Sequence, residues 1–400
     1  MSSEVPKKMS MARQAFEKIK QNKRFWLLVF LLIIIGLLIW LLIFYFHGKL
    51  KLKQLNNNKM ILSYQERGGT SIGSINSSNP QFIHLLRDYY VMSSYNSCCG
   101  GDSLKDFVDL TPLKQVINQG ARLLDFEIYS KNGNPIIAAG PEASSDGKFY
   151  LKGTYNSISF KSVMSTVKTH AFSGRTCPNP DDPLFLSFRI KTNSKLIYDY
   201  MGEVLRKLFG GHFLQARYSY EGRNIKSGKD SIPNIPLLNL KRKVIILVQD
   251  PNHNYRETKL HEFINISGKG TDGTGMPFAE FYKNKKIIMS HAIQDVINTN
   301  KKFLGFSQPD YSDTKNNSPA IIHQSKGVQF VMMNFSFLDD EHLINYLNYF
   351  NKKGSAFVLK PNHLRYFEKK IKPPKPQDPK VSYAPRPTPL LPGGVYTPPI

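Results

Sequence analysis

Cysteine is scarce in this chain of 400 residues. There are three cysteines, Cys98, Cys99 and Cys177, and two of them are adjacent. Three thiols are too few for a disulfide framework, and they lack the spaced Cys/His pairs of a zinc site. We therefore expect free thiols and exclude both the disulfide-stapled and the zinc-finger classes of protein.

Acidic residues are also in deficit. The chain has 30 Asp and Glu against 54 Lys and Arg, which gives a formal net charge of +24. Such a balance suits a partner with negative charge, either anionic lipid headgroups or nucleic acid. The basic residues are dispersed and no aromatic stacking motif accompanies them, so we expect no nucleic acid partner.

One long apolar run breaks this polar background, and it extends from Phe25 to Phe46 as FWLLVFLLIIIGLLIWLLIFYF. A helix of this length crosses a hydrocarbon core of ~30 Å. Trp26 and Tyr45 lie near its ends, where amphipathic rings prefer the headgroup region. A cleaved signal peptide is the alternative, but its apolar core would be shorter and would end in a small-residue cleavage site, which is not seen after Phe46. We predict a single-pass transmembrane helix over residues 25–46.

The charges that flank this run indicate its orientation. Residues 1–24 form a basic arm with seven Lys and Arg, whereas the other flank has Lys49, Lys51 and Lys53. The bias favours a cytoplasmic N-terminus, with the arm on anionic lipid.

Two further segments lack the pattern of a folded core. Residues 47–81 are predicted as a linker, because Asn56–Asn79 is rich in Asn, Ser and Gly without a helical or strand period, and the folded part is expected to begin near Phe82. Residues 372–400 are too rich in proline for a helix or a sheet interior. This tail is either a docking segment for an aromatic groove of a partner protein or a stiff solvated extension.

Short apolar runs alternate with helical patterns between the linker and the tail. Candidate strands are Tyr90–Met92, Leu123–Ile128, Pro135–Ala138, Leu184–Ile190, Lys243–Val248, Gln329–Phe335 and Ala356–Leu359; candidate helices are Lys114–Gln119, Phe160–Thr169, Ser194–Leu208 and Glu341–Asn351. This alternation predicts an α/β fold with a largely parallel sheet, closed as a TIM-type (β/α)8 barrel. A doubly wound open sheet is the alternative.

Several blocks of sequence resemble, in order, the two catalytic halves, X and Y, of eukaryotic-type phosphoinositide-specific phospholipase C. The X-like blocks are YYVMSSYNSCCGG (Tyr89–Gly101), GARLLDFEIY (Gly120–Tyr129), NPIIAAG (Asn134–Gly140), SFKSVMSTVKTHAFSG (Ser159–Gly174), PLFLSFRI (Pro183–Ile190) and LKRKVIILV (Leu240–Val248); the Y-like blocks are GVQFVMMNF (Gly327–Phe335) and GSAFVLKPNHLR (Gly354–Arg365). The resemblance divides the barrel into an X-like half at 82–253, a short X/Y linker at 254–276 and a Y-like half at 277–371.

The resemblance implies a barrel that cleaves inositol phospholipids through a cyclic phosphodiester. In that chemistry calcium lowers the pKa of the attacking hydroxyl, one histidine stabilises charge and a second exchanges protons. In this sequence Tyr95 matches the first histidine, followed by the metal-binding Asn96, and Ala139 matches the second. Loss of a general acid/base costs about 10²- to 10⁴-fold in rate, and a phenol with a pKa near ~10 is a poor replacement.

The resemblance also places three calcium ligands on two strands. Asp125 and Glu127 match an acidic pair, with the order of Asp and Glu reversed, and Arg189 replaces the third acid. Side chains two apart on a strand share a face, so the two carboxylates can converge. We expect the Arg189 guanidinium to stand where the ion would and to bond both carboxylates. No cofactor is expected, since calcium needs six to eight oxygen ligands.

Three functions remain open. The first is a membrane-anchored, catalytically impaired phospholipase C-like protein that acts as a lipid- or inositol-phosphate-binding or structural module, with membrane lipid, including anionic phosphoinositides, as its partner. The second is an active phosphodiesterase that uses Tyr95, Asp125 and Glu127 in a modified mechanism. In the third, the barrel is a spacer and the proline-rich tail binds a protein partner.

Overall fold

The computed structural model describes residues 11, 13–14, 16–20, 22–101, 105–140, 152–219, 231–250, 252–268, 279–310 and 316–367. The chain divides into a large unit, Met1–Arg365, and a second unit, Tyr366–Ile400. The proline-rich tail predicted at residues 372–400 and the first ten residues of the basic arm lie outside the described residues.

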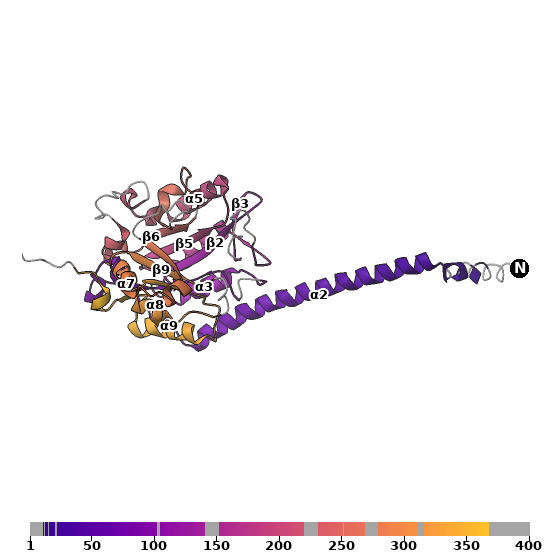
Figure 1. Cartoon of the computed structure of the whole chain (residues 1–400), viewed down its shortest axis with the longest axis horizontal. Helices are drawn as coiled ribbons and strands as arrows, with labels where there is room; N and C mark the ends of the chain where they lie inside the picture. The colour runs from indigo at the N-terminus through magenta and orange to yellow at the C-terminus, as the bar shows by residue number, and fades with distance from the viewer. Residues whose placement is uncertain are drawn as a thin grey trace, which may run out of the picture. The chain divides into compact units, whose positions relative to one another are not determined.

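Eight parallel strands form a nearly closed barrel (Figure 1). They are β1 (Tyr89–Ser94), β2 (Leu123–Lys131), β5 (Leu184–Ile190), β6 (Val244–Gln249), β7 (Ile264–Ser267), β8 (Ala279–Lys283), β9 (Leu304–Gln308) and β10 (Phe330–Met333). Their spatial order is β7-β6-β5-β2-β1-β10-β9-β8, so hydrogen bonds between β1 and β10 join the two halves. Within the described residues no pairing joins β7 to β8. The predicted TIM-type barrel is confirmed, and the open doubly wound sheet is not formed.

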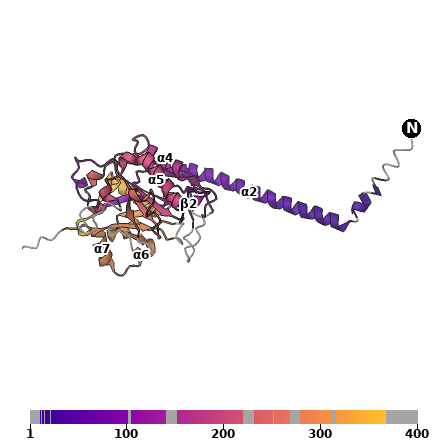
Figure 2. The same ribbon diagram turned by 90° about the horizontal axis from the view of Figure 1, so that it is seen from above.

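Amphipathic helices cover the outside of the barrel. They are α3 (Leu110–Asn118), α4 (Phe160–Ala171), α5 (Lys195–Phe209), α6 (Asn284–Ile288), α7 (Ile293–Lys302), α8 (Ala320–Ser325) and α9 (Glu341–Lys353). In α5 the buried Ile197, Met201, Leu205 and Phe209 recur every four residues and therefore share one face. Helices α4 and α5 pack against each other and against β3, and Figure 2 shows the two helices close together.

Three short strands extend the sheet beyond the barrel. β11 (Phe357–Leu359) pairs antiparallel with the start of β1. β3 (Asn134–Ala138) folds back on β2 as an antiparallel hairpin and also pairs with β4 (Ile158–Ser159). The hairpin is important for the site, because it returns the chain from the end of β2 to Glu127, which pairs with Ala138.

The N-terminal helix α2 is longer than the sequence predicts. It runs without interruption from Lys23 to Glu66, and by length and composition it is the one helix of the described residues that could cross a membrane. The linker predicted at residues 47–81 is wrong in its first part, because residues 47–66 are helical. Met60 and Tyr64, one helical turn apart, are buried in the core. The sequence pattern did not indicate this helix, because most residues around Met60 and Tyr64 in the sequence are polar.

The predicted X/Y linker also contains part of the barrel. Strand β7, which pairs with β6, lies inside the range 254–276 that we expected to be a connection. The strand is four residues long, and its alternation of Ile264 and Ile266 with Asn265 and Ser267 is too short to be recognised among polar neighbours. Residues 269–276 of the predicted linker are outside the described part.

Candidate functional site

Three neighbouring strands bring the five polar residues of the predicted site together at their carboxyl ends. Tyr95 and Asn96 directly follow β1, Asp125 and Glu127 belong to β2, and Arg189 belongs to β5. The carboxyl ends of parallel strands form the mouth of such a barrel. In the β2–β5 register, Asp125 lies beside Ser187 and Glu127 beside Arg189, so their side chains emerge on the same side of the sheet.

Arg189 is the centre of this group. Its Nε lies 3.1 Å from Asp125 Oδ2, and its Nη2 lies 2.7 Å from the same oxygen. Its Nη1 donates to Glu127 Oε1 at 2.5 Å and to the Tyr95 hydroxyl at 3.0 Å, and its second Nη2 proton goes to Asn96 Oδ1. A guanidinium has five N–H donors, and all five have acceptors here.

The ion pairs of Arg189 with Asp125 and Glu127 are buried. Arg189 is 7% exposed, while Asp125 and Glu127 are 0% and 2% exposed. The Tyr95 ring covers the guanidinium, with its centroid 4.3 Å from Arg189 Cζ, which is a cation–π contact. Burial by itself lowers the pKa of Arg189, but Asp125, Tyr95 and Glu127 raise it, and the net shift is well upward. The guanidinium therefore keeps its charge.

Burial has the opposite consequence for Tyr95. It raises the pKa of the phenol above its ordinary value, although the nearby charge of Arg189 opposes the shift. A phenol with a raised pKa stays protonated at neutral pH, so Tyr95 is not a base under these conditions.

Further groups hold the two carboxylates, and the sequence analysis missed them. Ser187 Oγ donates to Asp125 Oδ1 at 2.9 Å, and Tyr129 donates its hydroxyl proton to Glu127 Oε2 at 2.7 Å. Both could have been found by extending the two-residue strand period, since Ser187 precedes Arg189 by two residues and Tyr129 follows Glu127 by two. Each carboxylate is thus fixed from more than one side.

Two backbone amides complete these contacts. The Asn96 N–H donates to Asp125 Oδ2 at 3.1 Å, and the Gly140 N–H donates to Glu127 Oε2 at 2.9 Å. Asn96 has a φ of 44°, a left-handed conformation that Asn tolerates better than most residues. No sequence pattern predicts that these two backbone N–H groups donate to the carboxylates.

Ala139 lies directly after β3, at the edge of this group. It is fully buried, and its carbonyl accepts hydrogen bonds from the N–H groups of Gly153 and Thr154. The side chain is a methyl group, so this position supplies packing to the site but no proton donor or acceptor.

The calcium ion that the family resemblance implies does not fit these residues. The oxygens of Asp125 and Glu127 that face the centre already accept hydrogen bonds from Arg189, and the guanidinium fills the space between them. Calcium needs six to eight oxygen ligands. Among the described residues, no group of three or more His, Cys, Asp or Glu side chains is arranged to hold a metal ion.

Comparisons with known proteins agree with this architecture. Residues 83–250 match the family described as phosphatidylinositol-specific phospholipase C, X domain. PLC21 of L. pealei has a similar structure, with a TM-score of 0.56 at 19% identity over 71% of this chain and 38% of that chain. PLC21 of S. officinalis has a TM-score of 0.56 at 20% identity over 72% of this chain and 39% of that chain.

The chain spans about two fifths of the length of these two PLC21 chains. A search of curated protein sequences found no match. The similarity of the solved structures shows the barrel fold, and the match of residues 83–250 adds the family to which that part belongs. Residues 83–250 of this chain thus form a divergent X domain of the phosphatidylinositol-specific phospholipase C family.

Proposed function

We propose that this chain is a membrane-anchored phospholipase C-like protein that does not hydrolyse lipid and acts as a binding or structural module at the membrane. The observation that carries the proposal is the saturation of Arg189, whose five N–H donors bond Tyr95, Asn96, Asp125 and Glu127.

The groups around Arg189 lack what phosphodiester cleavage requires. A general base must be able to take a proton near neutral pH. Asp125 and Glu127 are engaged by the guanidinium, the phenol of Tyr95 has a raised pKa, and Ala139 has no titratable group. In the described part of the chain, these contacts therefore support the absence of a proton path and of a metal site at the positions that the family resemblance implies.

The same arrangement argues against phosphate binding at the centre of the mouth. A bound phosphate would need N–H donors from Arg189, and each of these already has an acceptor. Two carboxylates face one guanidinium, so the group as a whole does not attract an anion. We infer that any contact with anionic lipid is made by basic residues elsewhere, not by Arg189.

The membrane anchor in this proposal is the first part of α2. Its apolar residues 25–46 are exposed along their length, as expected for a helix whose partner is lipid. In a soluble protein, an apolar helix surface of this length would be buried in the core. The flanking charges favour an N-terminus on the cytoplasmic side.

A hydrolysis assay tests the proposal. The full chain, reconstituted in vesicles that contain phosphatidylinositol and supplied with calcium, is expected to release no inositol phosphate above the vesicle blank. The matched variant is Asp125→Ala, which removes a central carboxylate. Turnover by the parent chain that disappears in Asp125→Ala would establish the alternative, an active phosphodiesterase with a modified mechanism.

Calorimetry supplies an independent test. Titration of calcium into the reconstituted chain is expected to give no saturable heat in the micromolar range, because Arg189 occupies the space between the carboxylates. Saturable calcium binding that is lost in Asp125→Ala would show that a metal site remains. Binding of a protein partner by residues 372–400 stays a prediction of the sequence, and deletion of those residues tests it.

A further inference from the structure

Four triplets of the chain have the form Asn-x-Ser, and they begin at Asn76, Asn265, Asn316 and Asn334. In such a triplet the asparagine side chain can accept an N-linked oligosaccharide. Short motifs of this kind recur by chance, so the sequence alone does not distinguish between the four. The structure does, because an oligosaccharide is bulky and needs an asparagine that reaches solvent.

Two of these asparagines are buried in the barrel. Asn265, on β7, is 4% exposed; its Oδ1 accepts the Ile246 N–H at 2.9 Å, and its Nδ2 bonds the Tyr218 carbonyl at 3.2 Å. Asn334, directly after β10, is also 4% exposed, and its Oδ1 accepts both the N–H and the hydroxyl of Ser336. An oligosaccharide on either side chain would have no room in the folded barrel.

Asn316 is exposed, but the two residues that complete its triplet are held by the core. Asn317 is 4% exposed, and its Nδ2 bonds the Asn334 carbonyl at 3.0 Å. The hydroxyl of the half-buried Ser318 lies 2.8 Å from Nε2 of the buried His323. The serine hydroxyl is part of the motif that the transferring enzyme recognises, so this triplet is a poor acceptor.

The triplet at Asn76 is exposed throughout. Asn76, Ser77 and Ser78 lie in an exposed segment before the short helix η1 (Pro80–Phe82). The Asn76 Oδ1 accepts the Asn79 N–H at 3.1 Å. Within the described residues, neither the Asn76 Nδ2 nor the Ser78 hydroxyl forms a hydrogen bond. The nitrogen that a sugar would occupy and the hydroxyl that the motif requires are therefore both accessible.

The exposed triplet begins next to a fixed residue. Ile75 is fully buried, and its N–H bonds Asp182 Oδ1 at 2.7 Å. Asp182 lies just before the start of β5, so Asn76 is at the amino ends of the barrel strands, opposite to Arg189. An oligosaccharide on Asn76 would extend into solvent without contacting the group around Arg189.

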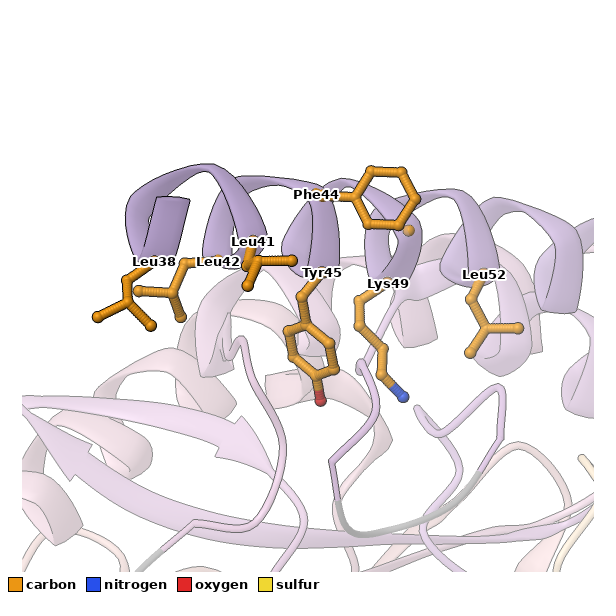
Figure 3. A pocket seen from close by; sticks show the side chains of 8 residues that line it. Leu38, Leu41, Leu42, Phe44, Tyr45, Lys49 and Leu52 are labelled. Carbon is orange, nitrogen blue, oxygen red and sulfur yellow. The ribbon is translucent and has the colours of Figure 1, made fainter. Parts of the chain in front are cut away.

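The side of the membrane on which the barrel lies also matters, because N-linked oligosaccharides belong to surfaces that enter the secretory route. The Tyr45 hydroxyl lies 2.6 Å from that of Tyr155, and Figure 3 shows Tyr45 and Lys49 pointing from α2 toward the barrel loops. Met60 and Tyr64 join the last turns of α2 to the core. The barrel therefore lies beyond the carboxyl end of the apolar run, away from the N-terminus.

We propose that Asn76 carries an N-linked oligosaccharide. The inference rests on the membrane anchor and the cytoplasmic N-terminus of the proposed function, which place the barrel on the lumenal side. The donor is an oligosaccharide carried on a polyprenyl pyrophosphate. Asn76 Nδ2 forms a bond to the anomeric carbon of the first sugar, and the bond from that carbon to the pyrophosphate oxygen breaks. The pyrophosphate leaves with the electron pair, Nδ2 loses one proton to a base of the enzyme, and nothing is oxidised or reduced.

Translation of the full chain in the presence of microsomal membranes tests the site. The parent chain is expected to give one band of lower electrophoretic mobility, which peptide N-glycosidase removes. Asn76→Gln and Ser78→Ala should each abolish this band, whereas Ser78→Thr, which keeps a hydroxyl, should retain it. Asn316→Gln is the matched control at the other exposed asparagine and should leave the band unchanged.

Carbonate extraction and protease treatment of the sealed membranes separate this inference from the proposed function. A chain that resists extraction and is protected from protease, but lacks the band, would overturn the oligosaccharide and leave the anchor intact. Digestion of the barrel in sealed membranes would overturn the cytoplasmic N-terminus and the oligosaccharide together. Release by carbonate of a chain that keeps the band would overturn the anchor alone. A band that persists in Asn76→Gln would overturn the assignment to Asn76.

Discussion

Arg189 presents its edge to Asp125, and both Nε, at 3.1 Å, and Nη2, at 2.7 Å, donate to the carboxylate oxygen Oδ2. Both side chains are buried, since Asp125 is 0% and Arg189 is 7% exposed. Each charge of such a pair was desolvated on folding and depends on the other for compensation. The pair is therefore a sensitive point of the fold as well as of the site.

Replacing Arg189 by glutamine should lower the free energy of unfolding by about 3–5 kcal/mol, because two buried carboxylates lose their cation. Urea denaturation of the full chain in detergent micelles measures this. The control is Arg242→Gln, whose partner Asp181 is at 2.7 Å but half exposed, and about 1 kcal/mol or less is expected there. Equal losses in the two variants would contradict the role given to Arg189.

Replacing Arg189 by glutamate should make the stability of the chain depend on calcium. Three acids and the Asn96 carbonyl would then converge, a set of hard oxygen ligands that suits this ion. Without calcium the variant is expected to unfold at a lower temperature than the parent chain, and added calcium should restore it by mass action. The parent chain should not respond.

Thermal denaturation with calcium, with magnesium and with a chelator measures this effect. Arg242→Glu is the control for a reversed charge at an exposed position. A variant Arg189→Glu that is insensitive to calcium would show that the carboxylates cannot be rearranged into a metal site.

Asp182 should make the fold less stable as the pH rises from about 4 to about 6. Burial raises the pKa of this carboxyl to about 6, although Arg122 opposes the shift. Because the folded pKa lies above the unfolded one, the favourable contribution is complete below the unfolded pKa and is lost as the pH passes the folded pKa. The difference corresponds to about 3 kcal/mol at most.

Urea denaturation across this pH range, with Asp182→Asn as the comparison, checks the effect. The asparagine variant keeps an acceptor for the Ile75 N–H, which bonds Asp182 Oδ1 at 2.7 Å, but cannot ionise. Its stability should vary less with pH than that of the parent chain. Parallel profiles would assign the pH dependence to other groups.

His323 should make the fold less stable as the pH falls, which is opposite to the effect of Asp182. Burial first, and Lys326 second, lower the pKa of its imidazole to about 4. Its contribution to stability is therefore present above the unfolded pKa and is lost as the pH falls through the folded pKa, by up to about 3 kcal/mol. The ring is held by Ser318 Oγ at 2.8 Å from Nε2, and its Nδ1 has no partner in the part of the chain that is described.

The variant His323→Gln removes the titration. Between about pH 7 and about pH 4 its free energy of unfolding should fall by less than that of the parent chain. An NMR titration of the His323 ring protons gives the pKa directly. A value near that of a free histidine would contradict the prediction.

The positions of the strands along the chain could be predicted from the sequence where a strand was a continuous apolar run. β5, with Leu184 and Ile190 at its ends, is an example, because a strand buried on both faces carries few polar residues. β8 and β9 were not recognised, since β8 contains Glu280 and Lys283 and β9 contains Gly305. The positions of β8 and β9 are set by pairing with each other and with β10, and not by local composition.

The contacts of Arg189 with Asp125 and Glu127 could be predicted because all three residues lie on adjacent parallel strands and alternate along them. That these residues occupy the family's metal positions stays a prediction. The donors from Asn96 and Gly140 could not be found in the same way, because a backbone amide carries no sequence signature. Site residues on strands are thus more predictable than site contacts from loops.

The continuity of α2 has a mechanical consequence. Its apolar half and the turns that contain Met60 and Tyr64 belong to one continuous helix without a proline, so there is no hinge between the barrel and the apolar half. With the membrane anchor that we propose, any tilt or rotation that bilayer thickness or a neighbouring helix imposes on this helix would turn the whole barrel by the same angle. The orientation of the barrel would then follow the thickness and composition of the membrane around the helix.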